Sequence, residues 1–265
     1  MKTYDFAFGL GRACACTQTM RRAGLQYLSL PWDWVAYDGN APDLLNRVDV
    51  TCNDFKGFLE MDDLEYRGPN AGPGKDNYLN RKSGMFFLHD FPKGVPLAES
   101  YPAVKAKYDR RIARFHQLIA KARSPILVVA MDSPLSKPTP LDDCRKARER
   151  LAERFPGAKF ELLNITLDSG RSIADRIDET VEDGLYHIAF DFKDHRPEAH
   201  DYDVDQRAVA SLLKARFAVR DYRTKDERRA MRERTRLVKM REAGASNRLQ
   251  YFLIRMKRRL EKMFR

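Results

Sequence analysis

Two short apolar runs near the middle of the chain constrain its fold more than any other feature. Residues 125–131 read PILVVAM and residues 159–167 read KFELLNITL, with a charged amphipathic segment at 141–155 between them. An uninterrupted apolar run of strand length is typical of the centre of a parallel sheet, where helices cover both faces. Strand, helix and strand in this order predict a βαβ unit whose strands are parallel.

The N-terminal residues repeat this order. Residues 5–10 (DFAFGL) predict a strand, residues 13–23 a helix, and the segment LQYLSLPWDWV a second strand that begins at Leu25 and ends at Pro31. The sequence therefore predicts an α/β fold with a mostly parallel sheet and helices on both faces, in a Rossmann-like three-layer arrangement. The other expected elements are a loop at 66–84, a strand at 85–91, a helix at 101–123, a short helix at 175–184 and a strand at 186–192.

Charge divides the chain into two parts. Residues 207–265 carry 20 Lys/Arg and six Asp/Glu, a net charge of +14, whereas the whole chain carries +11. The remaining residues are therefore close to neutral and need no polyanionic partner. No strand pattern is found after about Val204. We expect an α/β domain at 1–205, which carries the reactive site, and a basic helical tail at 206–265.

The end of the tail, residues 249–265 (LQYFLIRMKRRLEKMFR), predicts an amphipathic helix with Lys/Arg opposite an apolar stripe. Such a helix either binds an anionic membrane surface or packs on the domain or on a second copy. Nucleic acid is a poor match, because an apolar and aromatic stripe does not suit a contact with phosphates alone. The stripe consists of Leu249, Phe252, Leu253, Met256, Leu260, Met263 and Phe264.

Cysteine usage and hydropathy indicate the cellular compartment. The four cysteines, at positions 14, 16, 52 and 144, follow no disulfide framework, which favours free thiols in a reducing environment. The N-terminus is too polar for a secretion signal, and no apolar run approaches the roughly 18 residues of a membrane span. We expect a cytoplasmic protein, with the tail permitting peripheral association with the inner membrane face.

The turn after the first predicted strand raises a chemical question. Gly9, Gly11 and Cys14 occupy the positions of the three glycines in a G-x-G-x-x-G dinucleotide-binding loop. The turn could cradle a phosphate, present a thiolate, or form a tight corner around a well-packed cysteine. Cys14 replaces the glycine that permits close helix–strand packing, and GPNAGPGKD at 68–76 departs from a Walker loop, so no cofactor is expected.

The thiolate interpretation places Cys14 at the start of a helix. Unpaired backbone N–H groups and the helix dipole there lower the pKa of a thiol, and Arg12 would add to the effect. His89 is the predicted base, and Asp33 or Asp90 would orient its imidazole. A purely structural role is the alternative for each residue.

The segment SLPWDWV at 29–35 would follow its strand at the carboxyl edge, where open α/β sheets bind ligands. Trp32 and Trp34 would line a cleft there or belong to the core. Asp33 would alternatively hold a substrate hydroxyl or cap the following turn. Arg110 and Arg111 would bind substrate or face solvent.

A second polar cluster lies between residues 191 and 205. Its spacing matches no zinc or calcium pattern, and acidic loops commonly follow strands, so no metal site is expected. The candidate ligands are His195, His200, Asp201, Asp203 and Asp205.

Several blocks in the first half resemble a bacterial family of papain-like cysteine peptidases. The opening is similar to the family's G-x-x-C turn, arginine-containing helix ending in Gly-Leu, and S-x-P-F-D-W segment, with Trp32 in place of the phenylalanine. The blocks NDFKGFL (53–59), HDFP (89–92) and KYDRRIARF (107–115) follow in the family's order. The matching residues of the opening are Gly11, Cys14, Met20, Arg21, Gly24, Leu25, Ser29, Pro31, Asp33 and Trp34.

This resemblance implies Cys14 as nucleophile and His89 as base. The predicted function is a Cys–His hydrolase or acyl transferase, without a cofactor, acting on an unknown substrate that is a peptide or is linked to a glycan. The alternative is a non-catalytic protein of cell-surface glycan assembly that binds a nucleotide or sugar at the same sheet edge and docks to the membrane by its tail.

Overall fold

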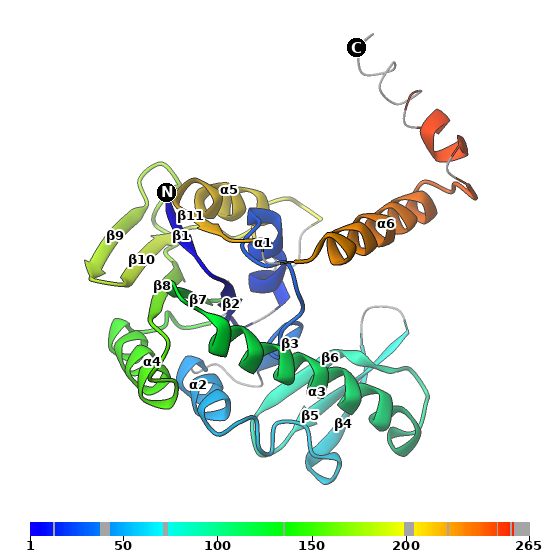
Figure 1. The fold of residues 1–265 in the computed structure, drawn as a ribbon, viewed down its shortest axis with the longest axis horizontal. Helices are drawn as coiled ribbons and strands as arrows, with labels where there is room; N and C mark the ends of the chain where they lie inside the picture. Colours follow the sequence, from blue (N-terminus) through cyan, green and yellow to red (C-terminus); the bar gives the residue numbers. More distant parts are fainter. Residues whose placement is uncertain are drawn as a thin grey trace. The chain divides into compact units, whose positions relative to one another are not determined.

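The computed structural model describes residues 1–12, 14–37, 43–70, 74–134, 136–198, 204–221, 223–247, 249–254 and 256 (Figure 1). The chain forms two compact units, Met1–Arg220 and Asp221–Arg265. The second unit contains helix α6 (Lys225–Glu242). Among the described helices, none is both long enough and apolar enough to cross a membrane.

A five-stranded sheet lies at the centre of the first unit. Its strand order is β2 (Ala7–Gly9), β7 (Ile126–Met131), β8 (Phe160–Leu167), β10 (Leu185–Phe190) and β9 (Ile177–Glu182). The first four strands are mutually parallel, and every residue of β7 is buried. The strands predicted from the two apolar runs are thereby confirmed, and the protein is a mixed α/β structure.

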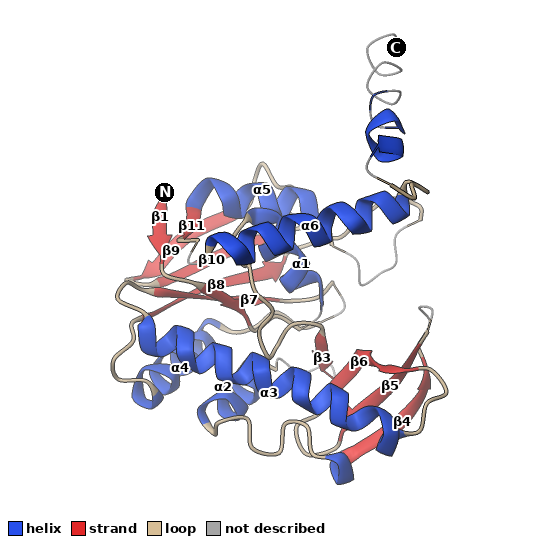
Figure 2. Cartoon of the chain, turned by 45° about the vertical axis from the view of Figure 1, so that its right-hand side comes forward, coloured by secondary structure: helices blue, strands red, loops and turns tan. Residues whose placement is uncertain are grey.

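Helices pack around this sheet. In both ribbon views α1 (Cys14–Ala23) and α5 (Gln206–Arg216) lie on one side of it, and α2 (Leu44–Cys52) and α4 (Leu141–Arg154) on the other (Figures 1 and 2). The long helix α3 (Leu97–Lys121) confirms the helix expected at 101–123. Its Phe115 ring packs edge-on against Phe8 of β2, at a centroid distance of 5.0 Å.

A separate antiparallel sheet was not expected. Its order is β3 (Val35–Tyr37), β6 (Met85–Pro92), β5 (Lys75–Asn80) and β4 (Leu64–Pro69). A 3-10 turn at Met61–Asp63 directly precedes β4 in the chain. The prediction of a loop at 66–84 is wrong, because the end of β4 and all of β5 lie within that range. Most β4 side chains are exposed, so this edge strand has the polar composition of a loop.

The prediction of a parallel strand that ends at Pro31 is also wrong, because residues 25–31 form no strand. Residues 31–34 form a turn, and Trp34 has a positive φ of 69° that interrupts extended backbone. The strand in this region is β3, of three residues, and it pairs antiparallel with β6. The parallel neighbour of β2 is β7 instead.

Two further differences concern sheet edges. The helix predicted at 175–184 is strand β9, which pairs antiparallel with β10 and carries charged, largely exposed side chains. Charges of this kind protect an edge strand from pairing with other molecules. They also replace the apolar pattern from which a strand is predicted in a sequence. Strand β11 (Phe217–Val219) pairs in parallel with β1 (Lys2–Tyr4), so strand structure does continue after Val204.

Aromatic side chains join the antiparallel sheet to the helices beside it. Phe58 contacts the rings of Trp32, Phe87 of β6 and Tyr108 of α3 at centroid distances of 5.0 to 5.5 Å. Such ring pairs are directional and exclude water, so they fix β6 relative to α3. The position of β6 matters because it carries His89.

Candidate active site

Cys14 is the first residue of α1, five residues after Gly9, where β2 ends. Backbone hydrogen bonds from Leu10 to Val129 and from Arg12 to Met131 continue the pairing with β7 up to this point. The Cys14 side chain is half-buried. The predicted position at a helix N-terminus, at the carboxyl edge of the parallel sheet, is therefore observed.

The two glycines of the turn serve helix packing. A Cβ atom on Gly11 would lie 2.5 Å from the Cys16 Cβ and 2.8 Å from the Met131 carbonyl oxygen. A Cβ on Gly9 would lie 2.9 Å from the Cys16 Sγ. Side chains at either position would push α1 off the sheet, so the tight-corner interpretation accounts for both glycines.

The other three thiols are held in their neutral form. Burial raises the pKa of Cys16 and of Cys144 to about 12, and that of Cys52 to about 11. Cys16 faces the sheet, with its Sγ 3.7 Å from the Val129 carbonyl. Thiols with such pKa values contain almost no thiolate at neutral pH and are poor nucleophiles.

His89 lies on β6 with an exposed side chain, beside Trp34. The two rings meet edge to face at a centroid distance of 5.9 Å. Partial burial lowers the pKa of the imidazole, and Lys75 and Lys107 act in the same direction against the opposing effect of Asp90. A lowered pKa favours the neutral imidazole, the state required of a general base.

Trp34 connects His89 to the face of α1 that carries Cys14. The Arg21 guanidinium lies over the Trp34 ring at 5.4 Å. Arg21 is two helical turns after Cys14, and seven residues bring a side chain back to nearly the same face, about 10.5 Å along the axis. These contacts connect His89 through Trp34 to Arg21, which lies about 10.5 Å along the helix axis from Cys14.

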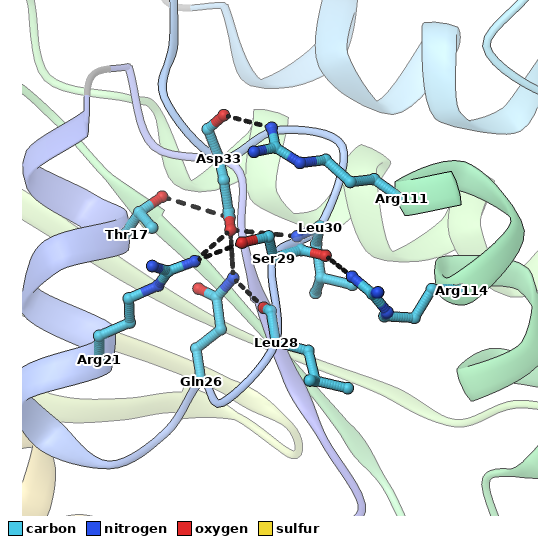
Figure 3. A network of polar contacts seen from close by, with 9 residues as sticks. All are labelled: Thr17, Arg21, Gln26, Leu28, Ser29, Leu30, Asp33, Arg111 and Arg114. Atoms are coloured by element: carbon cyan, nitrogen blue, oxygen red, sulfur yellow. Dashed lines mark hydrogen bonds and ion pairs between the residues drawn. The ribbon is translucent and has the colours of Figure 1, made fainter. Parts of the chain in front are cut away.

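Asp33 is fully buried and accepts hydrogen bonds on both carboxylate oxygens (Figure 3). Its donors are Gln26 at 2.8 and 2.9 Å, Arg21 at 3.0 Å, the Leu30 backbone at 3.0 Å and Thr17 at 3.4 Å. These donors hold residues 26–33 against α1. Burial raises the pKa of this carboxyl despite its donors.

Two arginines of α3 hold the same segment from the opposite side. Arg111 donates to the Asp33 carbonyl at 3.4 Å, and Arg114 donates to the Ser29 carbonyl at 2.7 Å (Figure 3). The Arg111 guanidinium also lies 4.9 Å from the centre of the Tyr108 ring. Arg110 is exposed on the same helix.

Asp90 faces away from its neighbour on β6. It is buried, and its carboxylate binds Lys107 and accepts a hydrogen bond from Tyr108 at 2.8 Å. Successive strand residues point to opposite sides, which separates this carboxylate from the exposed imidazole. Among the described residues, neither Asp33 nor Asp90 hydrogen-bonds to His89.

The remaining predicted site residues occupy different environments. Trp32 is buried in the aromatic core and donates from Nε1 to Thr51 at 2.9 Å. Trp34 is half-buried, and Arg12 is buried with its guanidinium 5.9 Å from the Tyr37 ring.

A buried ionic cluster beside the Cys14 turn was missed by the sequence analysis. Arg47 of α2 binds Asp43 through Nε at 2.5 Å, and both side chains are inaccessible to solvent. Asp132 follows β7, accepts from the Thr139 hydroxyl at 2.6 Å, and has its pKa raised by burial. Its position directly after the apolar run 125–131 was a usable signal, whereas nothing local distinguishes Arg47.

The polar cluster at 191–205 is a connecting segment. His195 lies 3.0 Å from Asp191, and Asp205 caps the N-terminus of α5 through the amides of Arg207 and Ala208. The described residues include no group of three or more His, Cys, Asp or Glu side chains arranged to bind a metal. His200, Asp201 and Asp203 lie outside the described residues.

Comparison with protein families gives a match over the part of the chain that contains this site. Residues 5–170 match the profile of a family described as "Putative papain-like cysteine peptidase (DUF1796)". The chain belongs to this family. The matched range includes Cys14 and His89. It also includes the antiparallel sheet and strands β2, β7 and β8 of the five-stranded sheet.

A viral protein is also similar. "Uncharacterized protein R408" of Acanthamoeba polyphaga mimivirus is 28% identical over 134 residues, which cover 45% of this chain and 58% of the viral protein. The match thus spans little more than half of that relative. No solved structure matches the chain significantly.

Proposed function

We propose that this member of the family is a cysteine-dependent hydrolase or acyl transferase with papain-like chemistry. Cys14 is the nucleophile and His89 the base. The observation that carries the proposal is the position of Cys14 at the start of α1, at the carboxyl edge of the parallel sheet, while burial suppresses ionisation of the other three thiols. Family membership adds independent support.

The proposed reaction proceeds through a thioester. The Cys14 sulfur forms a bond to the substrate carbonyl carbon while His89 accepts the thiol proton. The imidazolium then protonates the departing amine or alcohol, and the carbon–nitrogen or carbon–oxygen bond breaks. Water or a second acyl acceptor attacks the thioester, His89 accepts its proton, and the thiol is regenerated. Backbone N–H groups at the start of α1 would stabilise the oxyanion.

Orientation of the imidazole is assigned to Trp34. Asp33 and Asp90 are engaged with α1 and α3 respectively, so neither supports the role of the third triad member. The edge-to-face contact with Trp34 restricts the plane of the His89 ring. Trp34 is in turn held by Arg21. A substrate bound beside Trp34 would therefore affect both His89 and Arg21.

Thiol labelling tests the proposal. Native protein is treated with iodoacetamide from pH 5 to 9, and alkylation at each cysteine is quantified by mass spectrometry. Cys14 should react first and well below pH 8, and Cys14→Ser should abolish this fast phase. Equal rates at Cys52, which is half-buried and serves as the internal control, would contradict an activated Cys14.

We further propose that the tail associates with anionic membrane surfaces. Residues 249–254 and 256 are helical. Leu249, Phe252, Leu253 and Met256 share one face and are 69%, 58%, 57% and 43% exposed. The strongly basic composition of residues 207–265 complements anionic headgroups, at about 1 kcal/mol for each nearby Lys/Arg.

Vesicle sedimentation tests the membrane proposal. The full-length protein should pellet with anionic vesicles and remain in solution with neutral ones, and Phe252→Ser with Leu253→Ser should abolish pelleting. Ile173→Ser, which removes an exposed apolar side chain from the first unit, is the control and should pellet normally. Loss of pelleting in the control, or a concentration-dependent dimer that the double variant disrupts without any vesicle binding, would refute the proposal.

A further inference from the structure

Arg47 is a fully buried arginine whose hydrogen-bond donors are only partly satisfied. Its side chain has no exposed surface, and its carboxylate partner Asp43 is equally inaccessible. Nη1 has no hydrogen-bond partner among the described residues. Removing a guanidinium from water is costly unless its donors are satisfied, so a site that retains one needs a specific reason.

The remaining donor of Arg47 binds the backbone on two sides of the candidate active site. Nη2 lies 3.5 Å from the carbonyl oxygen of Arg12, two residues before Cys14. It also donates to the carbonyl of Val35 at 3.2 Å, one residue after Trp34. One side chain of α2 thus joins the turn that leads to the predicted nucleophile with the turn that presents Trp34.

The backbone at Trp34 requires support of this kind. Its φ of 69° is unfavourable for a bulky side chain and persists only where neighbouring contacts enforce it. Arg111 binds the carbonyl on one side of this residue and Arg47 the carbonyl on the other. The aromatic side chain that contacts His89 is therefore held from both α3 and α2.

Arg47 is itself rigidly placed. Its guanidinium lies 5.2 Å from the centre of the Trp32 ring, and Trp32 donates to the Thr51 hydroxyl at 2.9 Å. Thr51 donates in turn to the Arg47 carbonyl at 2.7 Å. A planar donor fixed by stacking and by Asp43 loses little freedom when it binds two carbonyls.

We propose that Arg47 is a positioning residue for the Cys14–His89 pair. It fixes the turn before Cys14 and the backbone of Trp34, and its positive charge favours the Cys14 thiolate. The inference rests on the proposed function. It adds the residue that holds Cys14 and His89 in position relative to each other.

The charges around Arg47 agree with this role. The Arg47 charge lowers the pKa of Cys16, against the larger effect of burial, so its field reaches the first turn of α1. Asp43 opposes that effect. Arg12 and Asp43 also act on Asp132, in opposite directions, so all four charged groups share one electrostatic neighbourhood.

Two substitutions separate position from charge. Arg47→Met removes the charge and both carbonyl contacts and retains much of the volume, whereas Arg47→Lys retains the charge but loses the planar fork. Arg148→Met is the matched control, because Arg148 also binds a carboxylate (Glu182, 3.1 Å) and a backbone carbonyl (Asp183, 2.8 Å), away from Cys14. Near-UV circular dichroism establishes folding, and the pH profile of Cys14 alkylation is the readout.

In Arg47→Met the midpoint of the alkylation profile should rise by roughly half a pH unit or more, as expected for loss of a nearby positive charge. In Arg47→Lys the midpoint should stay near that of the parent, while hydrogen exchange in peptides spanning residues 10–20 and 32–37 increases several-fold. Exchange in β7 should not change, which distinguishes local loosening from global destabilisation.

The outcomes are decisive for each variant. A folded Arg47→Met protein with the parent's alkylation profile overturns the inference. If Arg47→Met does not fold, the Arg47→Lys exchange data decide, and unchanged exchange in both peptides overturns it. Failure of the proposed function is recognised separately, because the parent protein would then show no fast alkylation at Cys14.

Discussion

Replacement of Gly11 by alanine tests why the turn before Cys14 contains glycine. The added Cβ would lie 2.5 Å from the Cys16 Cβ, 2.8 Å from the Cys16 Sγ and 2.8 Å from the Met131 carbonyl oxygen. The first and third of these atoms cannot rotate away, so α1 or the end of β7 must move. If the glycine were present instead to let a phosphate approach the backbone, Gly11→Ala would impair ligand binding and leave stability almost unchanged.

The expected size of the effect follows from these contacts. Overpacking a well-packed core costs about 1–3 kcal/mol, and two immovable contacts favour the upper end of that range. Alanine also reduces the entropy of the unfolded chain, which offsets about 0.4–1 kcal/mol. We therefore expect Gly11→Ala to lower the free energy of unfolding by roughly 2 kcal/mol, or about 4–8 °C in Tm for a unit of this size.

Urea unfolding followed by circular dichroism measures this difference. Gly157→Ala is the matched control, because its Cβ would meet no atom within 4 Å and its φ lies outside the left-handed region. The control should be neutral or slightly stabilising. In Gly9→Ala the clash is with the side-chain sulfur atoms of Cys16 and Met20, so Cys16→Ala should restore part of the lost stability. If Gly11→Ala is as stable as Gly157→Ala, the packing explanation is wrong.

Two further predictions concern titratable groups. His89→Ala should slow Cys14 alkylation at pH 7 by roughly threefold to tenfold, because no imidazole then accepts the thiol proton. The exposed His195→Ala should leave the rate unchanged, and equal rates in the two variants would contradict the proposed pair. Burial by itself would raise the pKa of Glu161. Hydrogen bonds from Lys2, Tyr4 and Tyr186 outweigh burial, so the net shift of this pKa is downward. A lowered folded-state pKa stabilises the protein above the unfolded-state value of about 4.5, and this contribution is lost as the pH falls through the folded-state pKa. Glu161→Gln should therefore flatten the stability profile below pH 5 in acid titrations monitored by Tm, and an unaltered acid limb would contradict this assignment.

The elements that could be predicted from the sequence are those whose burial is expressed locally. PILVVAM at 125–131 is buried on both faces, so its apolar run identifies β7 without knowledge of its neighbours. The glycine turn and the start of α1 at Cys14 have equally local signals. Family membership was also accessible, because the motif residues of the opening lie within one continuous segment.

Some edge strands with largely exposed side chains were not predicted correctly. The charged side chains of β9 lie on a sheet edge, where solvent contact removes the apolar pattern. Strands β1 and β11 are three residues each, and they pair across more than 200 residues of chain. No local pattern encodes such a pairing, because its stability comes from contacts that only the folded chain makes.

The candidate site divides in the same way. The sequence by itself was enough to select Cys14 and His89 as candidates, because a cysteine after a glycine turn and a histidine at a strand end are local features. Only the tertiary structure decided their surroundings. Asp33 and Asp90 carry the right chemistry, but packing against α1 and α3 directs their carboxylates into other networks. Arg47 carries no distinguishing signal, yet the packing of α2 brings its guanidinium to the carbonyls beside both turns, since hydrogen-bond partners are set by which elements meet.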